Sequence, residues 1–432
     1  QFLYFIGRST QVGAADAMNS LRFGIAVVGL SLVLLVVVLA PTGEPPGVGG
    51  VGGLGGDGGE AADALAVPPA PTRDPAAPAG LTSDDSAAEK DQTCRWRFVK
   101  YHPSAFETKW RKGVLRYQDR ICDALRTDFA TENKLYMAHM DRCALDRVVG
   151  ESGFPRNCSR TRHQPQAPFP DEAFSKFEYA LVCAAVERPE ALANVTFTDD
   201  MPRRYSYIEP LAGLLRHPKA CDGESHIFNK NYLVVDAWAA HRNDAFVKPG
   251  LSTSKRAGQV RSFYFDVGAS VWSEGLGSSS QDWFYSTYRQ RCIDFDRFHM
   301  WEVKPWKPSK VFGDIPGHLQ PRYHWYNVPA GIKRGSSRNP LTHIVSEATE
   351  DDFVMLKIDI DTPVVEVPLV KQIIEDRSVS GLVDEFFFEH HVNMEVMRGP
   401  WSIDRNDPVK QLASLEIFSK LRELGIRAHS WI

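Results

Sequence analysis

The C-terminal part of this chain, residues 251–432, is predicted to be an α/β domain with a doubly wound, mostly parallel β-sheet. Three observations predict this fold class. Short apolar runs alternate with segments whose apolar residues recur at helical spacing. One of these runs, residues 353–358, is typical of a parallel strand that is covered on both faces. Several runs also end in an acidic residue, as strands do at a polar binding edge.

The elements of this region follow one another as strand and helix. The strands are expected at residues 263–265, 298–301, 323–328, 353–358, 383–388 and 426–432. Ser280 can cap the first helix, and another helix is expected to start near Pro368. Asp407 and Pro408 form a good N-cap and first position for the last helix, which Gly425 would close. Units of this kind predict a Rossmann-like sheet.

A membrane anchor is expected near the N-terminus. Residues 23–40 form an apolar run without charge or proline. As a helix this run is about 27 Å long, close to the roughly 30 Å of a bilayer core. Arg22 precedes the run and acids follow it, so residues 1–22 are expected in the cytosol and the rest in the lumen. A buried core helix and a signal peptide cleaved after Ala40 are the alternatives.

Residues 41–90 consist largely of Gly, Pro, Ala and acids. Such a segment cannot bury enough apolar surface to offset its ordering entropy, so a disordered stalk is expected. An anchor followed by a stalk is the usual plan of type II enzymes of the Golgi. By this analogy the protein is expected to be a single-pass protein of the Golgi or another secretory-pathway membrane, with a luminal catalytic domain.

The next region, residues 91–250, contains six of the seven cysteines. They are Cys94, Cys122, Cys143, Cys158, Cys183 and Cys221. Six cysteines in a luminal segment permit three disulfides in about 15 pairings, and buried free thiols are the alternative. No two have the spacing of a zinc knuckle, so no metal ligands are expected. Asn157 and Asn194 begin glycan-acceptor tripeptides. Helical spacing between residues 171 and 186 predicts a mainly helical region, whose role is not assigned.

Composition and motifs exclude several classes of function. The formal net charge is −4, so nucleic-acid binding is not expected. The chain contains no P-loop, no Gly-x-Ser-x-Gly turn and no His-Glu-x-x-His helix. NTPase, serine hydrolase and zincin functions are therefore set aside.

Polar residues follow four of the predicted strands. They are Asp266, Glu302, the pair Asp359 and Asp361, and the group Glu389, His390 and His391. Ligands of open parallel sheets bind at the carboxyl ends of the strands. Gly268 has no Cβ and lets the backbone approach a ligand closely. The Glu302 carboxylate offers two acceptor oxygens, enough for both hydroxyls of a ribose. This pairing predicts a nucleoside ligand.

The same residues resemble a known family. Residues 265–270, Phe-Asp-Val-Gly-Ala-Ser, resemble motif I of class I methyltransferases, and 301–305 are similar to the Glu-Pro ending of their second strand. Residues 327–330 and 356–361 resemble the Asn-Val-Ala and Lys-Ile-Asp-Val-Glu stretches of the FkbM group. The resemblance implies a Rossmann-like domain, S-adenosylmethionine as cofactor and O-methylation of a hydroxyl, often on a sugar or glycan.

The resemblance also implies roles for single residues. Asp266, Gly268, Ala269 and Ser270 would bind the cofactor, the first three at its methionine end, and Glu302 would hold its ribose.

There are two departures from the family pattern. Trp272 stands where motif I has a glycine, and glycines come later, at Gly275 and Gly277. Thr362, followed by Pro363, replaces the glycine after the signature acid.

Methyl transfer to oxygen needs alignment and the removal of one proton. His390 or His391 has a suitable pKa for a general base, and adjacent positions on a strand let at most one of them face the site. Asp359 or Asp361 can also act as the base or orient the substrate hydroxyl. The expected partners are a small-molecule or glycan substrate and, through the N-terminal helix, a membrane.

Two other functions are compatible with the sequence. Asp359 and Asp361 match the Asp-x-Asp motif of glycosyltransferases, in which carboxylates hold a divalent cation on the phosphates of a nucleotide sugar. Glu389 or His391 could be a further ligand. The other alternative is a degenerate fold that binds glycans or partners without catalysis, which the changed motif I loop and Thr362 favour.

Overall fold

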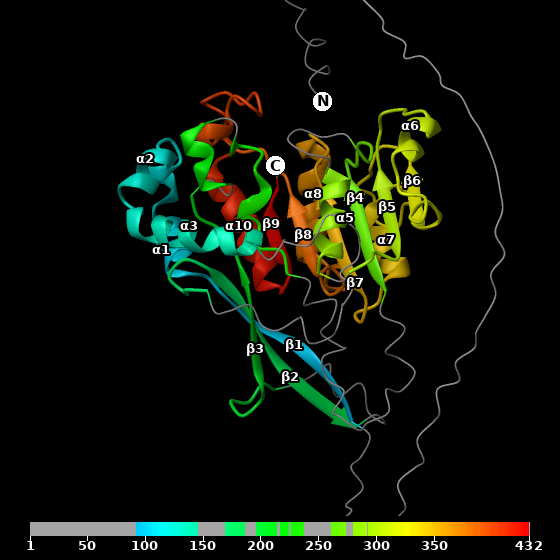
Figure 1. Cartoon of the computed structure of the whole chain (residues 1–432), viewed down its shortest axis with the longest axis horizontal. Helices are drawn as coiled ribbons and strands as arrows, with labels where there is room; N and C mark the ends of the chain where they lie inside the picture. Colours follow the sequence, from blue (N-terminus) through cyan, green and yellow to red (C-terminus); the bar gives the residue numbers. More distant parts are fainter. Residues whose placement is uncertain are drawn as a thin grey trace, which may run out of the picture. The chain divides into compact units, whose positions relative to one another are not determined.

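The computed structural model describes most of the chain from residue 92 onward (Figure 1). The described ranges are 92–145, 169–185, 196–213, 217–223, 226–236, 261–273, 280–291 and 293–431. They all lie in one compact unit, Ser83–Ile432. Within these ranges, no helix has the length and apolar character needed to cross a membrane. The predicted tail, span and stalk, residues 1–90, lie outside the described part of the chain.

A six-stranded sheet forms the centre of the C-terminal region (Figure 1). Its strands are β4 (Ser262–Val267), β5 (Arg297–Trp301), β6 (Tyr323–Tyr326), β7 (Phe353–Ile358), β8 (Glu385–Phe388) and β9 (Arg427–Ser430). They lie in the order β6-β5-β4-β7-β8-β9, and every neighbouring pair is parallel. All residues of β7 are buried, as expected for a strand covered on both faces. The predicted α/β class with a parallel sheet is confirmed, and the order agrees with a Rossmann-like domain.

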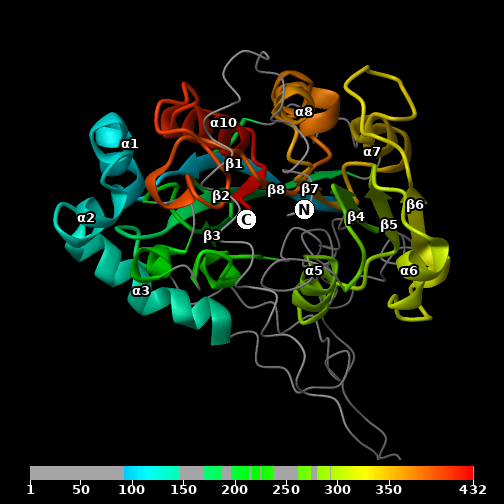
Figure 2. The ribbon, with the colours of Figure 1, turned by 90° about the horizontal axis from the view of Figure 1, so that it is seen from above.

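Helices cover both faces of this sheet. The α-helices are α5 (Ser280–Arg289), α6 (Pro308–Gly313), α7 (Pro340–Glu347), α8 (Pro363–Glu375), α9 (Arg377–Ser380) and α10 (Gln411–Glu423). Two short 3₁₀ helices, η7 (Gln320–Arg322) and η8 (Glu395–Met397), lie in the connections. Figure 2 shows α7, α8 and α10 on one face and α5 on the other.

Two helix starts differ from the prediction. Helix α8 begins at Pro363, and Pro368 lies inside it. Proline is best tolerated in the first turn, where the backbone N–H has no helical partner, so the earlier proline marks the start. Helix α10 has its N-cap at Lys410, because the Asp407 side chain accepts a hydrogen bond from Val409 N in a preceding turn. Gly425 follows the helix with a φ of 93°, as predicted for its end.

In the described part of the region upstream, helices occur together with a β-sheet, and the helix predicted between residues 171 and 186 is wrong, because residues 175–185 form a strand. The region contains an antiparallel sheet of β1 (Gln92–His102), β2 (Ser175–Ala185) and β3 (Arg203–Ile208), in that order. Its helices are α1 (Ala105–Tyr117), α2 (Ile121–Arg126), α3 (Ala130–Leu145), η4 (Pro218–Asp222) and η6 (Lys230–Tyr232).

The error lies in the apolar pattern of β2. Phe177 and Leu181 recur at helical spacing, but Phe177, Tyr179 and Leu181 also alternate, and these three pack together in one core cluster. Strand β2 pairs with β1 on one side and β3 on the other. Because β2 has a hydrogen-bonded strand on each side, these residues form a strand, in which the alternating pattern applies, and not a helix.

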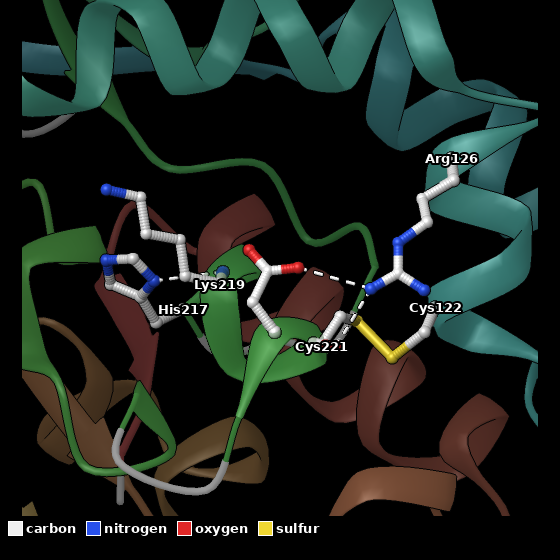
Figure 3. Close-up of a disulfide and its surroundings, with 6 residues drawn as sticks. Cys122, Arg126, His217, Lys219 and Cys221 are labelled. Carbon is white, nitrogen blue, oxygen red and sulfur yellow. Dashed lines mark hydrogen bonds and ion pairs between the residues drawn. A yellow bond between two sulfur atoms is a disulfide. The ribbon is translucent and has the colours of Figure 1, made fainter.

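Two of the expected disulfides form in this region. Cys94 and Cys183 lie opposite each other in the β1–β2 register and are bonded. Cys122 and Cys221 join α2 to η4, and Figure 3 shows Arg126 beside this bond. The Arg126 guanidinium donates to the Cys221 carbonyl at 2.9 Å. The side chains of the other two cysteines of the region, and both Asn of the glycan-acceptor tripeptides, lie outside the described part.

A buried ionic network ties the upstream region to the last helix and strand. Arg422 of α10 contacts the Glu209 carboxylate at 3.2 Å. The His429 ring of β9 lies between Glu209, at 2.8 Å, and Glu385, at 3.0 Å. Arg427 donates to Ser206 of β3 at 2.8 Å. Because these groups are almost fully buried, each depends on its partners to offset the cost of desolvation.

Candidate functional site

The site described here lies where the strand order reverses. Strands β4, β5 and β6 run outward in one direction, and the chain then returns to place β7 on the other side of β4. In doubly wound sheets ligands bind outside the carboxyl ends of the strands at this switch point. We call residues 266–270, 302, 359–361 and 389–391 the switch-point edge. All the site residues predicted from the sequence belong to it.

Gly268 is the most constrained residue of this edge. Its φ is 93°, and a Cβ at this position would lie 1.7 Å from the carbonyl oxygen of Asp359. The absence of a Cβ at Gly268 was predicted to let the backbone approach a ligand closely. In the structure it lets the end of β7 approach Gly268 closely. Gly268 N and Ala269 N both donate to the Trp301 carbonyl at 3.0 Å. The loop after β4 is thus fixed between its two neighbouring strands.

Glu302 lies directly beside this loop. One oxygen of its carboxylate accepts from Ser270 N at 3.1 Å and the other from Lys304 N at 2.7 Å. Ser270 has a φ of 53°, which is rare for a residue with a side chain. Strained backbone of this kind occurs most often at functional sites. Gly268, Ser270 and Glu302 are all partly exposed, so a ligand can reach them.

Asp266 and Ala269 lie beneath the surface of the loop. Asp266 is fully buried and accepts from Tyr264 Oη at 2.5 Å and from Lys357 Nζ at 3.0 Å. The Ala269 carbonyl accepts from Gln281 Nε2 of α5 at 2.8 Å. The structure therefore buries Asp266 below the exposed residues of the edge, where it positions other groups, whereas Glu302 is partly exposed. The chain between these two acids does fold as strand, helix and strand.

Lys357 connects three parts of the edge. Its ammonium contacts Asp266 at 3.0 Å, the Gly268 carbonyl at 3.2 Å and Asp359 at 3.2 Å. Burial lowers its pKa, but the two carboxylates outweigh burial, and the net shift is upward. Lys357 therefore stays charged and holds the ends of β4 and β7 together. Sequence reasoning gave it no role, although a single lysine in a strand that is otherwise apolar is the signal that could have found it.

The second part of the edge is a cluster of Asp361, Glu389 and His391. His391 Nε2 lies 3.4 Å from a carboxylate oxygen of each acid. Trp401 stacks on the His391 ring at 4.9 Å and donates to Glu389 at 2.9 Å. Burial lowers the pKa of His391, but the two acids outweigh it, so the pKa rises. Asp361 has a φ of 54°, the second strained residue of the edge.

His390 turns away from these acids. Its ring packs on Phe388 at 5.2 Å, and burial lowers its pKa to about 4. The structure therefore brings His391, but not His390, into the cluster. Asp359 is buried and contacts Lys357, whereas Asp361 is exposed and contacts His391.

Sequence reasoning missed two further residues near this edge, Glu366 and Lys230, whose pKa values are shifted toward neutral pH. Burial raises the pKa of Glu366 to about 7, and its carboxylate accepts from Ile360 N at 2.7 Å. Lys230 comes from η6 of the upstream region and is 5% exposed. Burial, followed by the charge of Lys357, lowers its pKa to about 8. No pattern in residues 91–250 places Lys230 here, since only the packing of the two regions does so.

Trp272 and Thr362, the two departures from the family pattern, can now be placed. Trp272 is buried and packs on Tyr285 and Phe298, so its ring fills the space between α5 and the sheet. Thr362 donates to the Ile360 carbonyl at 3.0 Å, just before α8. The two glycines at 275 and 277 lie outside the described residues.

The cluster can also hold a cation. Asp361, Glu389 and His391 each offer one ligand atom within 4.8 Å of the others. Two carboxylates and one imidazole suit a divalent metal such as Mn²⁺. Of the predicted Asp-x-Asp pair, Asp361 belongs to this cluster, and Asp359 contacts Lys357 at 3.2 Å.

The fold and the edge together define an α/β protein with a parallel sheet and a polar, strained site at its switch point. Comparisons of the chain with protein-family models, curated proteins and solved structures gave no match.

Proposed function

We propose that this protein is an S-adenosylmethionine-dependent O-methyltransferase, similar to the FkbM type, that acts on a hydroxyl of a sugar or glycan. The proposal rests on one observation above the others. Glu302 and the strained loop 268–270 lie in contact beside the switch point of a parallel sheet. This is the arrangement in which a nucleoside would be held by its ribose while the loop backbone faces the rest of the ligand.

The residues of the edge suit this cofactor. Glu302 has two carboxylate oxygens for the ribose hydroxyls, and both now accept backbone N–H groups that a ligand could replace. Gly268 and Ser270 are the exposed positions of the loop, while Asp266 and Ala269 support it from below. When bound, the cofactor supplies an electrophilic methyl group. The acids Asp361 and Glu389 give this part of the edge negative charge, which favours a sulfonium and an ammonium group.

His391 is the general base of this proposal. Its Nε2 lies between the carboxylates of Asp361 and Glu389, and in the neutral ring this nitrogen could accept the proton of a substrate hydroxyl that enters between them. Asp361 and Glu389, each 3.4 Å away, would stabilise the imidazolium that forms. Alignment of the hydroxyl with the methyl group supplies most of the acceleration. Asp361, which is exposed, would orient that hydroxyl.

The cellular setting is part of the proposal. An anchor at residues 23–40 and a stalk at 41–90 would hold the domain in the lumen of a secretory-pathway membrane, where glycans are modified. Two disulfides in the region upstream agree with an oxidising compartment.

Ligand-dependent thermal stability tests the proposal. We expect S-adenosylhomocysteine to raise the Tm of the purified chain and UDP with Mn²⁺ to leave it unchanged. In the Glu302→Ala variant the shift with S-adenosylhomocysteine should disappear, while a Glu350→Ala variant, changed at an exposed acid outside the edge, should keep it. A shift with UDP and Mn²⁺ alone, or with neither ligand, would overturn the proposal.

A glycosyltransferase is the second candidate, and the cation geometry of Asp361, Glu389 and His391 favours it. In that case these three residues would hold the divalent cation, and Asp359 would remain in contact with Lys357. This function leaves the contact between Glu302 and the loop without a purpose, and so it ranks below methyl transfer.

A further inference from the structure

A second cluster lies on the face of the sheet that α7 covers. It consists of His299 on β5 and of His343 and Glu347 on α7. None of these residues belongs to the switch-point edge. We propose that they form a binding site for zinc or a similar first-row transition metal ion, independent of the proposed methyl transfer.

The positions of the ligand atoms suit one small cation. His299 Nε2 lies 3.4 Å from one oxygen of Glu347, and His343 Nδ1 lies 4.0 Å from the other. All three ligand atoms lie within 4.8 Å of one another. Zinc bonds of about 2.0–2.2 Å in tetrahedral geometry separate neighbouring ligand atoms by roughly 3.4 Å. His343 and Glu347 are four residues apart on a helix, so their side chains share a face.

In both histidines, the ring nitrogen that would not bind the metal already has a hydrogen-bond partner. His343 Nε2 lies 2.8 Å from the Ser337 carbonyl, which can only accept a hydrogen bond. Nε2 therefore carries the proton, and Nδ1 keeps its lone pair toward Glu347. His299 Nδ1 shares a hydrogen bond of 3.0 Å with the Tyr326 hydroxyl. Histidine ligands of metals are commonly oriented by such a contact at the other nitrogen.

His299 supplies an independent sign of a ligand. The residue is 1% exposed, and its Nε2 is buried with no hydrogen-bond partner. A buried polar atom without a partner costs free energy that a bound ion would remove.

The surroundings allow entry and limit the type of ion. The Glu347 side chain is 29% exposed and that of His343 19%, which leaves room for water as a fourth ligand. His324 stacks on His299, and its Nε2 lies 3.2 Å from the guanidinium of Arg297. Two imidazoles and one carboxylate suit zinc or cobalt better than calcium or magnesium.

Cobalt and zinc binding by the full chain tests this site. After removal of metal with a chelator, we expect Co²⁺ to produce the intense visible absorption of a four-coordinate complex, and Zn²⁺ to displace it. The variants His343→Gln and Glu347→Gln should lose this absorption. Tyr326→Phe keeps the stacked ring but removes the contact to His299, and it should weaken zinc binding by about 10- to 100-fold.

The matched control is His391→Gln, which removes a ligand atom from the cluster at the switch-point edge. This variant should keep the cobalt absorption. Circular dichroism checks that the variants fold. The proposal is overturned if wild type gives no four-coordinate absorption, if folded His343→Gln and Glu347→Gln retain it, or if only His391→Gln abolishes it.

Discussion

The ammonium of Lys357 lies 3.0 Å from the carboxylate of Asp266, and the two residues face each other in the register of β4 and β7. Both side chains are almost completely buried. Lys357 also contacts Asp359, so one cation lies between two acids at the point where the strand order reverses. These contacts fix the end of β7 relative to the loop after β4. The edge is therefore already formed before any ligand binds.

Removal of Lys357 should therefore destabilise the fold strongly. We expect Lys357→Met to lower the free energy of unfolding by about 3–5 kcal/mol, because it removes the cation that both buried carboxylates, Asp266 and Asp359, contact. Urea denaturation measures this change. Lys371→Met, at an exposed position of α8, is the control and should stay within about 0.5 kcal/mol of wild type. Equal effects of the two substitutions would show that the buried contact contributes nothing.

Gly268 should tolerate no side chain. In Gly268→Ala the Cβ would meet the Asp359 carbonyl at 1.7 Å, so β7 must move or the loop must change conformation. We expect a loss of more than about 2 kcal/mol in the free energy of unfolding. Gly317→Ala is the matched control, since a Cβ there meets nothing within 4 Å. A Gly268→Ala protein with the Tm of Gly317→Ala would contradict the packing described.

Protonation of His429 should stabilise the fold at low pH. Burial lowers its pKa, but Glu209 and Glu385 outweigh burial, so the folded pKa lies above the unfolded value of about 6.5. The resulting stability is fully present below pH 6.5 and is lost as the pH rises through the folded pKa. The penalty of His429→Gln in chemical denaturation should thus be largest near pH 6 and shrink in alkaline buffer. A penalty that grows with pH would reverse this assignment.

The two disulfides should contribute strongly to stability. They link residues 89 and 99 positions apart in the sequence. In the chain-entropy account, loops of this length give about 4–5 kcal/mol each as an upper value. We expect the double variant Cys94→Ser/Cys183→Ser to have a lower Tm than wild type, and a reductant to lower the Tm of wild type further than that of the variant. A Tm that no reductant changes would mean that these bonds do not form.

His391 should control the pH dependence of methyl transfer, if the proposed function holds. His391→Gln should reduce kcat by about 10²- to 10⁴-fold while the shift in Tm with S-adenosylhomocysteine persists. In wild type the rate should fall as the pH drops through the raised pKa of His391, because the protonated ring cannot accept a proton. His390→Gln, whose ring packs on Phe388, is the control and should keep this pH profile. An unchanged kcat in His391→Gln would exclude it as the base.

Local patterns predicted most of the parallel sheet. The apolar run at β7 and the turn after β4 were readable because burial on both faces and a tight turn impose strict demands on residue type. The same reasoning failed at β2, where Phe177 and Leu181 fit two periodicities. Only the presence of β1 and β3 on both sides selected the strand. A pattern compatible with two elements is resolved by hydrogen-bond partners that lie far away in the sequence.

The candidate site was predictable in part. The positions of Glu302 and of the acids 359, 361 and 389 follow from strand ends, which a sequence reveals. The burial of Asp266 under Lys357 does not, because it depends on the register of two strands that are 91 residues apart.

The sequence by itself determined the order of the six strands in residues 251–432, three of the helices and the acids at the strand ends, since periodicity and turn chemistry are local. The tertiary structure decided which of these acids face outward, that His391 and not His390 joins them, and that Lys230 of the upstream region lies nearby. It also created the cluster of His299, His343 and Glu347. Side chains meet across a sheet only when long-range packing fixes both elements, and no local pattern encodes that distance.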